Sequence, residues 1–291
     1  MHVFCVMKRF WLVILSLWLC SVAFATDQPQ STGELPGLFF INTKRDKVCF
    51  SQGNLRCEPS STPKVWSFAE HQYDILGTNN LNGSNFADVI DLIAWSGNKY
   101  NNYGVTNDFG TMPYEGTFVD WGDNKINNGG NKMRLWRTLS AEEWSYLLEH
   151  HDKKVVTIEN VKGLVILPDN CSLTLNDLAD TYTETTWQPV EIQGAVFLPT
   201  TGRRYNGTIQ DINDGYYWTC TSTDVSQSKA TCVHFSFINL NVKLLNTQTD
   251  TRSYGFAIRL VKIKEDCKAT LRVIPNIPEA GSFTISELQG D

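Results

Sequence analysis

Along most of the chain, apolar and polar residues alternate or gather in short runs, and this pattern predicts a fold made mainly of strands. Runs of this length, bounded by turn residues, are typical of half-buried strands. The predicted strands cover residues 38–42, 47–51, 55–57, 155–158, 164–167, 195–198, 216–219, 231–237, 241–245 and 256–263.

One segment has clear helical spacing. Ser140 is followed three positions later by Glu143, which is the pattern of a capping box. Trp144, Leu147 and Leu148 then fall on one helical face. We therefore expect a helix to begin after Ser140.

Residues 77–132 are crowded with Asn, Gly, Asp and Tyr, and their periodicity is weak. Within this stretch only residues 86–95 have spacing that indicates a short helix. A segment this long with little regular structure is usually a functional loop region or an insertion.

The first 25 residues have the features of a signal peptide. A basic start at Lys8 and Arg9 precedes the apolar run 10–19, and residues 23–25 (AFA) supply a cleavage site. The run is shorter than the roughly 20 residues that a spanning helix needs. We expect cleavage before Thr26 and export to the periplasm, the cell surface or the medium, with no membrane span in the mature chain.

The charge balance argues against a nucleic-acid partner. The net charge is −6, and the Lys and Arg residues form no cluster of the kind that binds phosphates. Charged residues make up 19% of the chain and aromatic residues 12%. This composition suits a β-rich extracellular protein with polar, uncharged loops.

Cysteine usage predicts disulfides. Two of the eight cysteines lie in the leader, and six in an oxidising compartment allow 15 pairings. Residues 52–54 (QGN) have the composition of a hairpin loop. A three-residue loop places Cys49 opposite Cys57, within bridging reach, whereas a two-residue loop shifts the register and separates them. We expect a Cys49–Cys57 bridge.

Several motifs resemble one family. Residues 136–144 (WRTLSAEEW) and 254–261 (YGFAIRLV) resemble the helix start and the closing strand of sulfatase-modifying, formylglycine-generating proteins. Residues 215–222 (GYYWTCTS) resemble their Trp-containing strand. The order also resembles that of secreted bacterial major-paralogous-domain proteins. The segments that match these are 48–55 (VCFSQGNL), 109–112 (FGTM), 121–122 (WG) and 126–130 (INNGG).

The resemblance implies an α+β, β-rich, C-type-lectin-like fold with long irregular loops, few helices, and first and last strands side by side. It implies a domain over residues 35–264, after a flexible lead-in at 26–34. Residues 265–291 are then a C-terminal strand pair or the truncated start of a further module.

The related enzymes use two close cysteines to bind copper, since thiolates suit copper(I). Only Cys220 and Cys232 lie in the corresponding region, twelve positions apart, and they do not match the enzyme pattern. They flank a polar loop, so a second hairpin disulfide is expected, with Cys171 and Cys267 unassigned. We therefore expect no catalytic residue and no cofactor, with a formylglycine-generating-type oxidase as the alternative.

One loop carries oxygen ligands of the kind that calcium prefers, on Asp120, Asp123 and Asn124. The sequence allows a structural calcium ion there. It equally allows a loop whose Asp and Asn residues serve turn geometry.

Two groups of residues are candidates for ligand binding. Arg and Tyr are enriched at recognition sites, and the resemblance implies a display surface between the Trp-containing strand and the closing strand. The candidates are Arg203, Arg204, Tyr205, Tyr217, Asn239, Asn241, Asn246 and Gln248. The expected function is an exported, lectin-like module that binds a glycan or a protein through surface loops. A structural module of a cell-surface adhesin is a further alternative.

Overall fold

The computed structural model describes residues 32–81, 89–96, 117–205, 207–222, 228–238 and 241–265, without the side chains of 242–244. All of them belong to one compact unit, Ser31–Asp291. The predicted leader, most of the lead-in and the predicted strands after 265 lie outside these residues. In the described part of the chain, no helix is long and apolar enough to cross a membrane.

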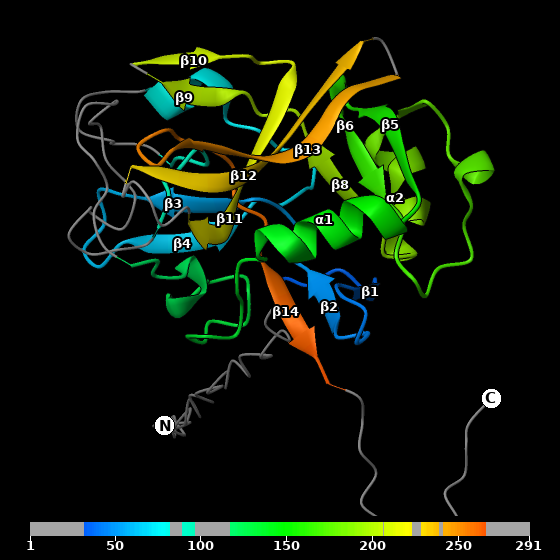
Figure 1. Cartoon of the computed structure of the whole chain (residues 1–291), viewed down its shortest axis with the longest axis horizontal. Coiled ribbons are helices and arrows are strands. Elements are labelled where there is room, and N and C mark those ends of the chain that lie inside the picture. The colour runs from blue at the N-terminus through cyan, green and yellow to red at the C-terminus, as the bar shows by residue number, and fades with distance from the viewer. Residues whose placement is uncertain are drawn as a thin grey trace, which may run out of the picture. The chain divides into compact units, whose positions relative to one another are not determined.

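The fold is β-rich, as the sequence pattern predicts, with fourteen strands and two α-helices in the described residues (Figure 1). The described residues also contain three short 3₁₀ helices: η1 (Gly77–Leu81), η3 (Trp121–Asp123) and η4 (Leu175–Asp177).

The first and last described strands share one sheet. Its order is β1–β2–β14, and both pairings are antiparallel. Its strands are β1 (Phe39–Phe40), β2 (Lys47–Phe50) and β14 (Val261–Lys264). Chain segments more than 200 residues apart in the sequence therefore lie side by side.

The predicted hairpin between β2 and the next strand is wrong. That strand, β3 (Leu55–Glu58), pairs with β4 (Val65–Phe68) instead. The chain does not turn back at residues 52–54. Ser51 and Leu55 donate their backbone N–H groups to the carbonyls of Leu260 and Ile258. The chain therefore runs on alongside residues 254–261, here called the closing segment, and passes from one sheet to another.

A four-stranded sheet of order β7–β5–β6–β8 contributes side chains to two buried clusters. Its strands are β5 (Lys153–Ile158), β6 (Val161–Ile166), β7 (Thr181–Tyr182) and β8 (Val196–Pro199). Helix α2 (Glu184–Ile192) contributes Trp187 and Val190 to the cluster on one face. Sequence analysis missed this helix, which contains Pro189.

The third large sheet, β11–β12–β13, is fully antiparallel. Its strands are β11 (Asp214–Ser222), β12 (Lys229–Ile238) and β13 (Asn241–Thr251), and a small β9–β10 ribbon (Arg203–Tyr205, Thr208–Gln210) accompanies it. Helix α1 (Ala141–His150) contacts all three strands of the sheet.

Helix α1 begins where the sequence predicts. The Ser140 side chain accepts the Glu143 N–H, and the Glu143 carboxylate accepts the Ser140 N–H, so the capping box is complete. The other predicted helix, at 86–95, is wrong for its described part. Ile90 and Ile93 form extended bridges with Cys57 and Phe256.

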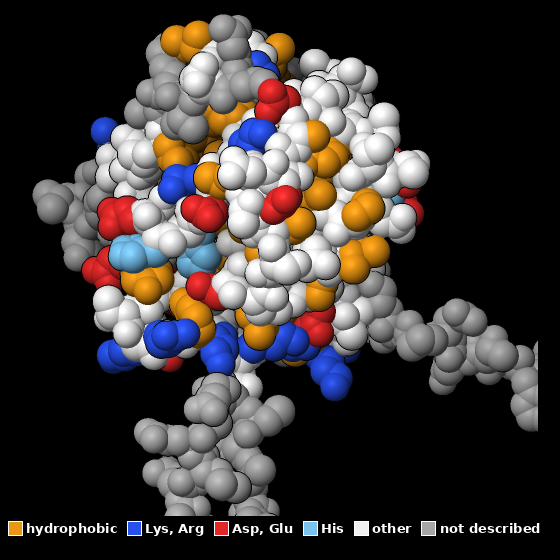
Figure 2. All heavy atoms as spheres, turned by 90° about the vertical axis from the view of Figure 1, so that its right-hand side faces the viewer, with side chains coloured by type: hydrophobic (Ala, Val, Ile, Leu, Met, Phe, Trp, Pro, Cys, Tyr) orange, Lys and Arg blue, Asp and Glu red, His pale blue; other side chains and the backbone are white. Residues whose placement is uncertain are grey.

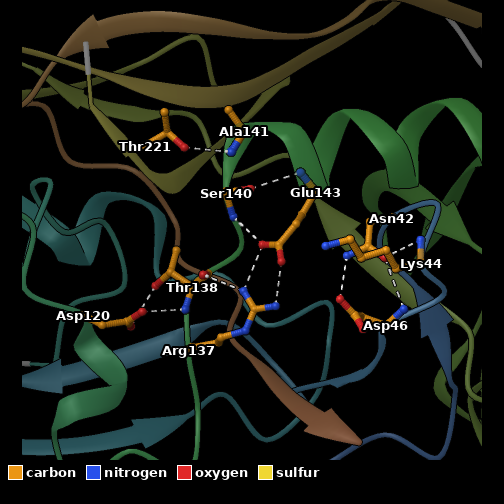
Figure 3. A network of polar contacts seen from close by, with 10 residues as sticks. All are labelled: Asn42, Lys44, Asp46, Asp120, Arg137, Thr138, Ser140, Ala141, Glu143 and Thr221. Carbon is orange, nitrogen blue, oxygen red and sulfur yellow. Dashed lines mark hydrogen bonds and ion pairs between the residues drawn. The ribbon is translucent and has the colours of Figure 1, made fainter. Parts of the chain in front are cut away.

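The start of α1 is joined to the neighbouring segments by a polar network (Figure 3). Arg137 donates two hydrogen bonds to the Glu143 carboxylate, at 2.7 and 2.9 Å. Burial raises the pKa of Glu143, but hydrogen bonds from Arg137 and Ser140 outweigh it, so this pKa lies below its usual range. One carboxylate thus serves both the helix cap and the cation.

Arg259 lies at the centre of the fold and is 1% exposed. Its guanidinium donates to the backbone oxygens of Ser51 and Phe197 and to the side-chain oxygen of Gln72. Gln72 in turn donates to Glu191 of α2 and to the Ala195 carbonyl. The closing segment, the end of β2, β8 and α2 are therefore tied together through one cation, and burial lowers its pKa to about 10.

Replacing Arg259 by Met should destabilise the protein by about 3 kcal/mol, because two buried carbonyls lose their donor. Urea denaturation measures the free energy of unfolding. The matched control is Arg134→Met, since the Arg134 side chain is 79% exposed. A variant Arg259→Met as stable as this control would contradict the role given to the guanidinium.

The lowered pKa of Glu143 predicts a pH dependence. The carboxylate stabilises the fold above the ordinary pKa of glutamate, and this contribution disappears as the pH falls through the lower folded value. Glu143→Gln should cost about 1–2 kcal/mol at neutral pH and clearly less in strong acid. Denaturation at both pH values measures this, with the exposed Glu142→Gln as control. An equal loss at both pH values would be inconsistent with the prediction.

Candidate functional site

One face of the β11–β12–β13 sheet carries polar side chains from all three strands. The register places Tyr216, His234 and Asn246 in one cross-strand row. Trp218, Cys232 and Gln248 form the next row on the same side. We call this side, with the flanking Arg203, Tyr205, Asp211 and Tyr254, the polar face.

The opposite side of the sheet is covered by α1. Tyr217 and Val233 belong to the cluster that contains Trp144 and Leu147 of the helix. Thr247 lies within hydrogen-bond distance of Ser145, at 3.4 Å. On the polar-face side, Tyr216, Trp218 and Cys232 belong to a second buried cluster, so both sides of β11 and β12 contribute to the core.

Arg203 of β9 is the centre of the polar face. Its guanidinium lies 5.4–6.0 Å from the ring centroids of Tyr205, Tyr216 and Tyr254. It also forms ion pairs with Asp211 at 2.8 Å and Asp250 at 3.6 Å. The cation is thus fixed by aromatic and carboxylate groups together, which leaves it little freedom to reorient.

His234 extends the same arrangement. Its ring stacks on Tyr216 with centroids 4.2 Å apart. Its Nε2 lies 3.0 Å from a carboxylate oxygen of Asp214. Burial raises the pKa of Asp250, despite the nearby Arg203. The polar face therefore combines aromatic rings, a cation, a histidine and several carboxylates.

The predicted ligand-binding residues separate into two groups. Arg203 and Tyr205 are half-buried on the polar face, Asn246 is exposed there, and Gln248 is half-buried beside it. Asn241 is exposed at the start of β13. Asn239 lies outside the described residues.

Two predicted residues belong to the interior instead. Arg204 is 2% exposed, and its backbone pairs with Gly255. Tyr217 is fully buried and donates its hydroxyl to the Pro199 carbonyl at 2.8 Å. The burial of Arg204 follows from the alternation of strand residues, because its neighbours Arg203 and Tyr205 lie on the polar face. Tyr217 lies in a stretch of β11 that is buried on both sides.

Sequence analysis did not select Asp214, His234, Asp250 or Tyr254 as ligand-binding candidates. Tyr254 was noticed only as part of a motif. The other three lie on strands β11, β12 and β13, and only the cross-strand register shows that they converge. The alternation along β12 was a usable signal, because His234 lies between two apolar neighbours, Val233 and Phe235.

The residues predicted to bind calcium are each engaged by a different protein group. Asp120 accepts a hydrogen bond from the Gly122 N–H. It also accepts hydrogen bonds from Thr138 (Figure 3). Asp123 pairs with Arg134 at 3.0 Å, and Asn124 donates to the Trp121 carbonyl. These contacts fit the reading in which the loop's polar residues serve its own geometry. Within the described ranges, no group of three or more His, Cys, Asp or Glu side chains could hold a metal ion.

Neither predicted disulfide forms, and Cys49, Cys57, Cys171, Cys220 and Cys232 all have free thiols. Cys49 and Cys57 lie on strands that pair with different partners. Cys232 faces Trp218 in the register, whereas Cys220 falls where the β11–β12 pairing is irregular, and its N–H donates to Leu139. Burial raises the pKa of the Cys220 thiol to about 11.

Compared with known proteins, the chain matches no family model, no curated protein and no solved structure. Any ligand for the polar face therefore has to be inferred from the side chains of this face.

Proposed function

We propose that this chain is an exported, non-catalytic, lectin-like module that binds a glycan or protein ligand through the polar face. The observation that carries the proposal is the convergence of Arg203, Tyr205, Tyr254, Asn246 and Gln248 on one side of a sheet. Of the two ligand classes, the chemistry of this face favours a glycan.

The side chains match the chemistry of a sugar. Amide, carboxylate and guanidinium groups donate to or accept from hydroxyl groups, and aromatic rings offer flat apolar area. Asn246 is exposed, and Gln248, Tyr205 and Tyr254 are half-buried, so part of each side chain faces solvent. A ligand with many hydroxyl groups could therefore use several of them at once.

The polar face is also fixed before any ligand arrives. Arg203 is held by Asp211 and Asp250, and His234 by Asp214 and the Tyr216 ring. Side chains held in this way lose little conformational entropy on binding. The α1 helix supports the strands from behind, so recognition groups lie on a rigid element.

The sequence resemblance supports the same proposal. It implies a lectin-like fold and an exported protein, and the β-rich fold with strands β2 and β14 side by side agrees with the architecture that it implies. Cys220 lines a surface pocket, whereas Cys232 belongs to a buried cluster, and the proposal gives neither thiol a role in copper binding.

A glycan array probed with the full exported chain tests the proposal. We expect selective binding, and the double substitution Asn246→Ala, Gln248→Ala should weaken it about tenfold or more. The matched control is Thr249→Ala on the same strand, because Thr249 is exposed and points to the other side of the sheet. Equal binding by the double variant and the control would refute the role of the polar face. Capture of one protein ligand with the same mutational pattern would assign a protein in place of a glycan.

A further inference from the structure

A groove lies at the opposite end of the molecule from β9 and β10, next to β14 (Figure 1). It has a volume of about 770 Å³ and is bounded by the turn after β1, by β14 and by Arg137. Its apolar lining comes from Ile41, Val48 and Ile263, and Ile263 is 56% exposed.

Strand β14 presents an open edge along this groove. In the described residues, the sheet order β1–β2–β14 ends at β14. Arg137 pairs with Val261 on the outer side of the strand, through hydrogen bonds in both directions. Because backbone groups alternate sides along an antiparallel strand, the N–H and C=O of Ile263 face the same outer side. An added strand would find both of them there.

Cations surround this edge. Five basic residues line the groove against three carboxylates, and one residue of each kind, Arg137 and Glu143, form an ion pair with each other. Lys262 and Lys264 share the single carboxylate of Glu34, at 3.2 and 2.9 Å. Figure 2 shows Lys and Arg side chains gathered along the lower edge of the molecule, at the level of β2 and β14 in Figure 1.

The turn that carries two of these cations is held in a defined shape. The Asn42 side chain accepts the N–H groups of Lys44 and Asp46 and donates to the Asp46 carboxylate (Figure 3). Arg45 has a φ of 63°, and its guanidinium lies over the Phe40 ring at 4.2 Å. Lys44 and Arg45 are both exposed, on a turn that is fixed before binding.

We propose that an extended acidic segment of a partner protein binds here by adding a strand to the open edge of β14. The residue opposite Ile263 would share its face and contact the apolar lining, while its neighbours would share the faces of Lys262 and Lys264. The segment that fits therefore alternates acidic and apolar residues. This inference is independent of the ligand proposed for the polar face.

Fluorescence anisotropy with the full exported chain tests this proposal. The probe is a labelled peptide of about ten residues that alternates glutamate and valine, long enough to form one strand. At low ionic strength we expect saturable binding that weakens as salt is added. An alternating lysine and valine peptide of the same length should not bind.

Two sets of variants separate the backbone contact from the charges. Ile263→Pro removes an outward N–H that takes no part in the pairing with β2 and should weaken binding about tenfold, whereas Ile263→Val, which keeps the N–H, should not. Lys44→Gln combined with Arg45→Gly should also weaken it about tenfold, and glycine adopts the positive φ of position 45 without strain. Thermal melting checks that each variant is folded.

Three outcomes would overturn the proposal. These are failure of the wild-type chain to bind the acidic peptide, equal binding by Ile263→Pro and Ile263→Val, and equal binding of the basic peptide. Binding to anionic vesicles or nucleic acid through Lys44 and Arg45, without peptide binding, would assign these cations to another polyanion and refute strand addition.

Discussion

The fold depends on a buried guanidinium without a carboxylate directly bonded to it. Arg259 is held by two backbone carbonyls and the Gln72 side chain. Burying a charge of this kind is costly unless hydrogen bonds compensate for the lost solvation, and here both terminal nitrogens are hydrogen-bonded whereas Nε is buried without a partner. The geometry of the closing segment, the end of β2 and β8 is therefore constrained together. If any one of these segments were displaced, the guanidinium or a backbone carbonyl would lose its hydrogen-bond partner.

The parts of the fold that could be predicted from the sequence are those formed by contacts between residues close in the chain. The start of α1 was predictable because the capping box is a local pattern, formed within four residues. The course of the chain after β2 was not predictable, because Ser51 and Leu55 bond to Leu260 and Ile258, about 200 positions away. The local pattern of apolar residues and turn residues is the same whether a strand turns back or runs on. Only the partner strand decides between them.

The polar face shows the same limit at the level of side chains. Arg203 and Tyr205 were identified from their chemistry alone, and both lie on this face. Arg204 and Tyr217 have equally suitable chemistry but point into the core. Strand alternation separates the two pairs once the inward side is known, but one residue's burial has to be established first. Asp250 could not be associated with Arg203 from sequence, because their contact depends on how β9 lies over the sheet.

Strand alternation also places the groups at two further surfaces, the polar face and the open edge of β14. On β13, Asn246 and Gln248 lie on the side of the sheet away from α1, where Asn246 is exposed and Gln248 is half-buried. Strand β14 differs, because its start is covered by Arg137 and its last residues are not. Arg137 is in turn held in place by Glu143 and the cap of α1. The position of the open edge is therefore set by a helix cap, and the charge around it by a turn that Asn42 shapes. The helix cap and the turn are each formed by residues close together in the sequence. This edge could therefore change in charge or length without disturbing the contacts of Arg259.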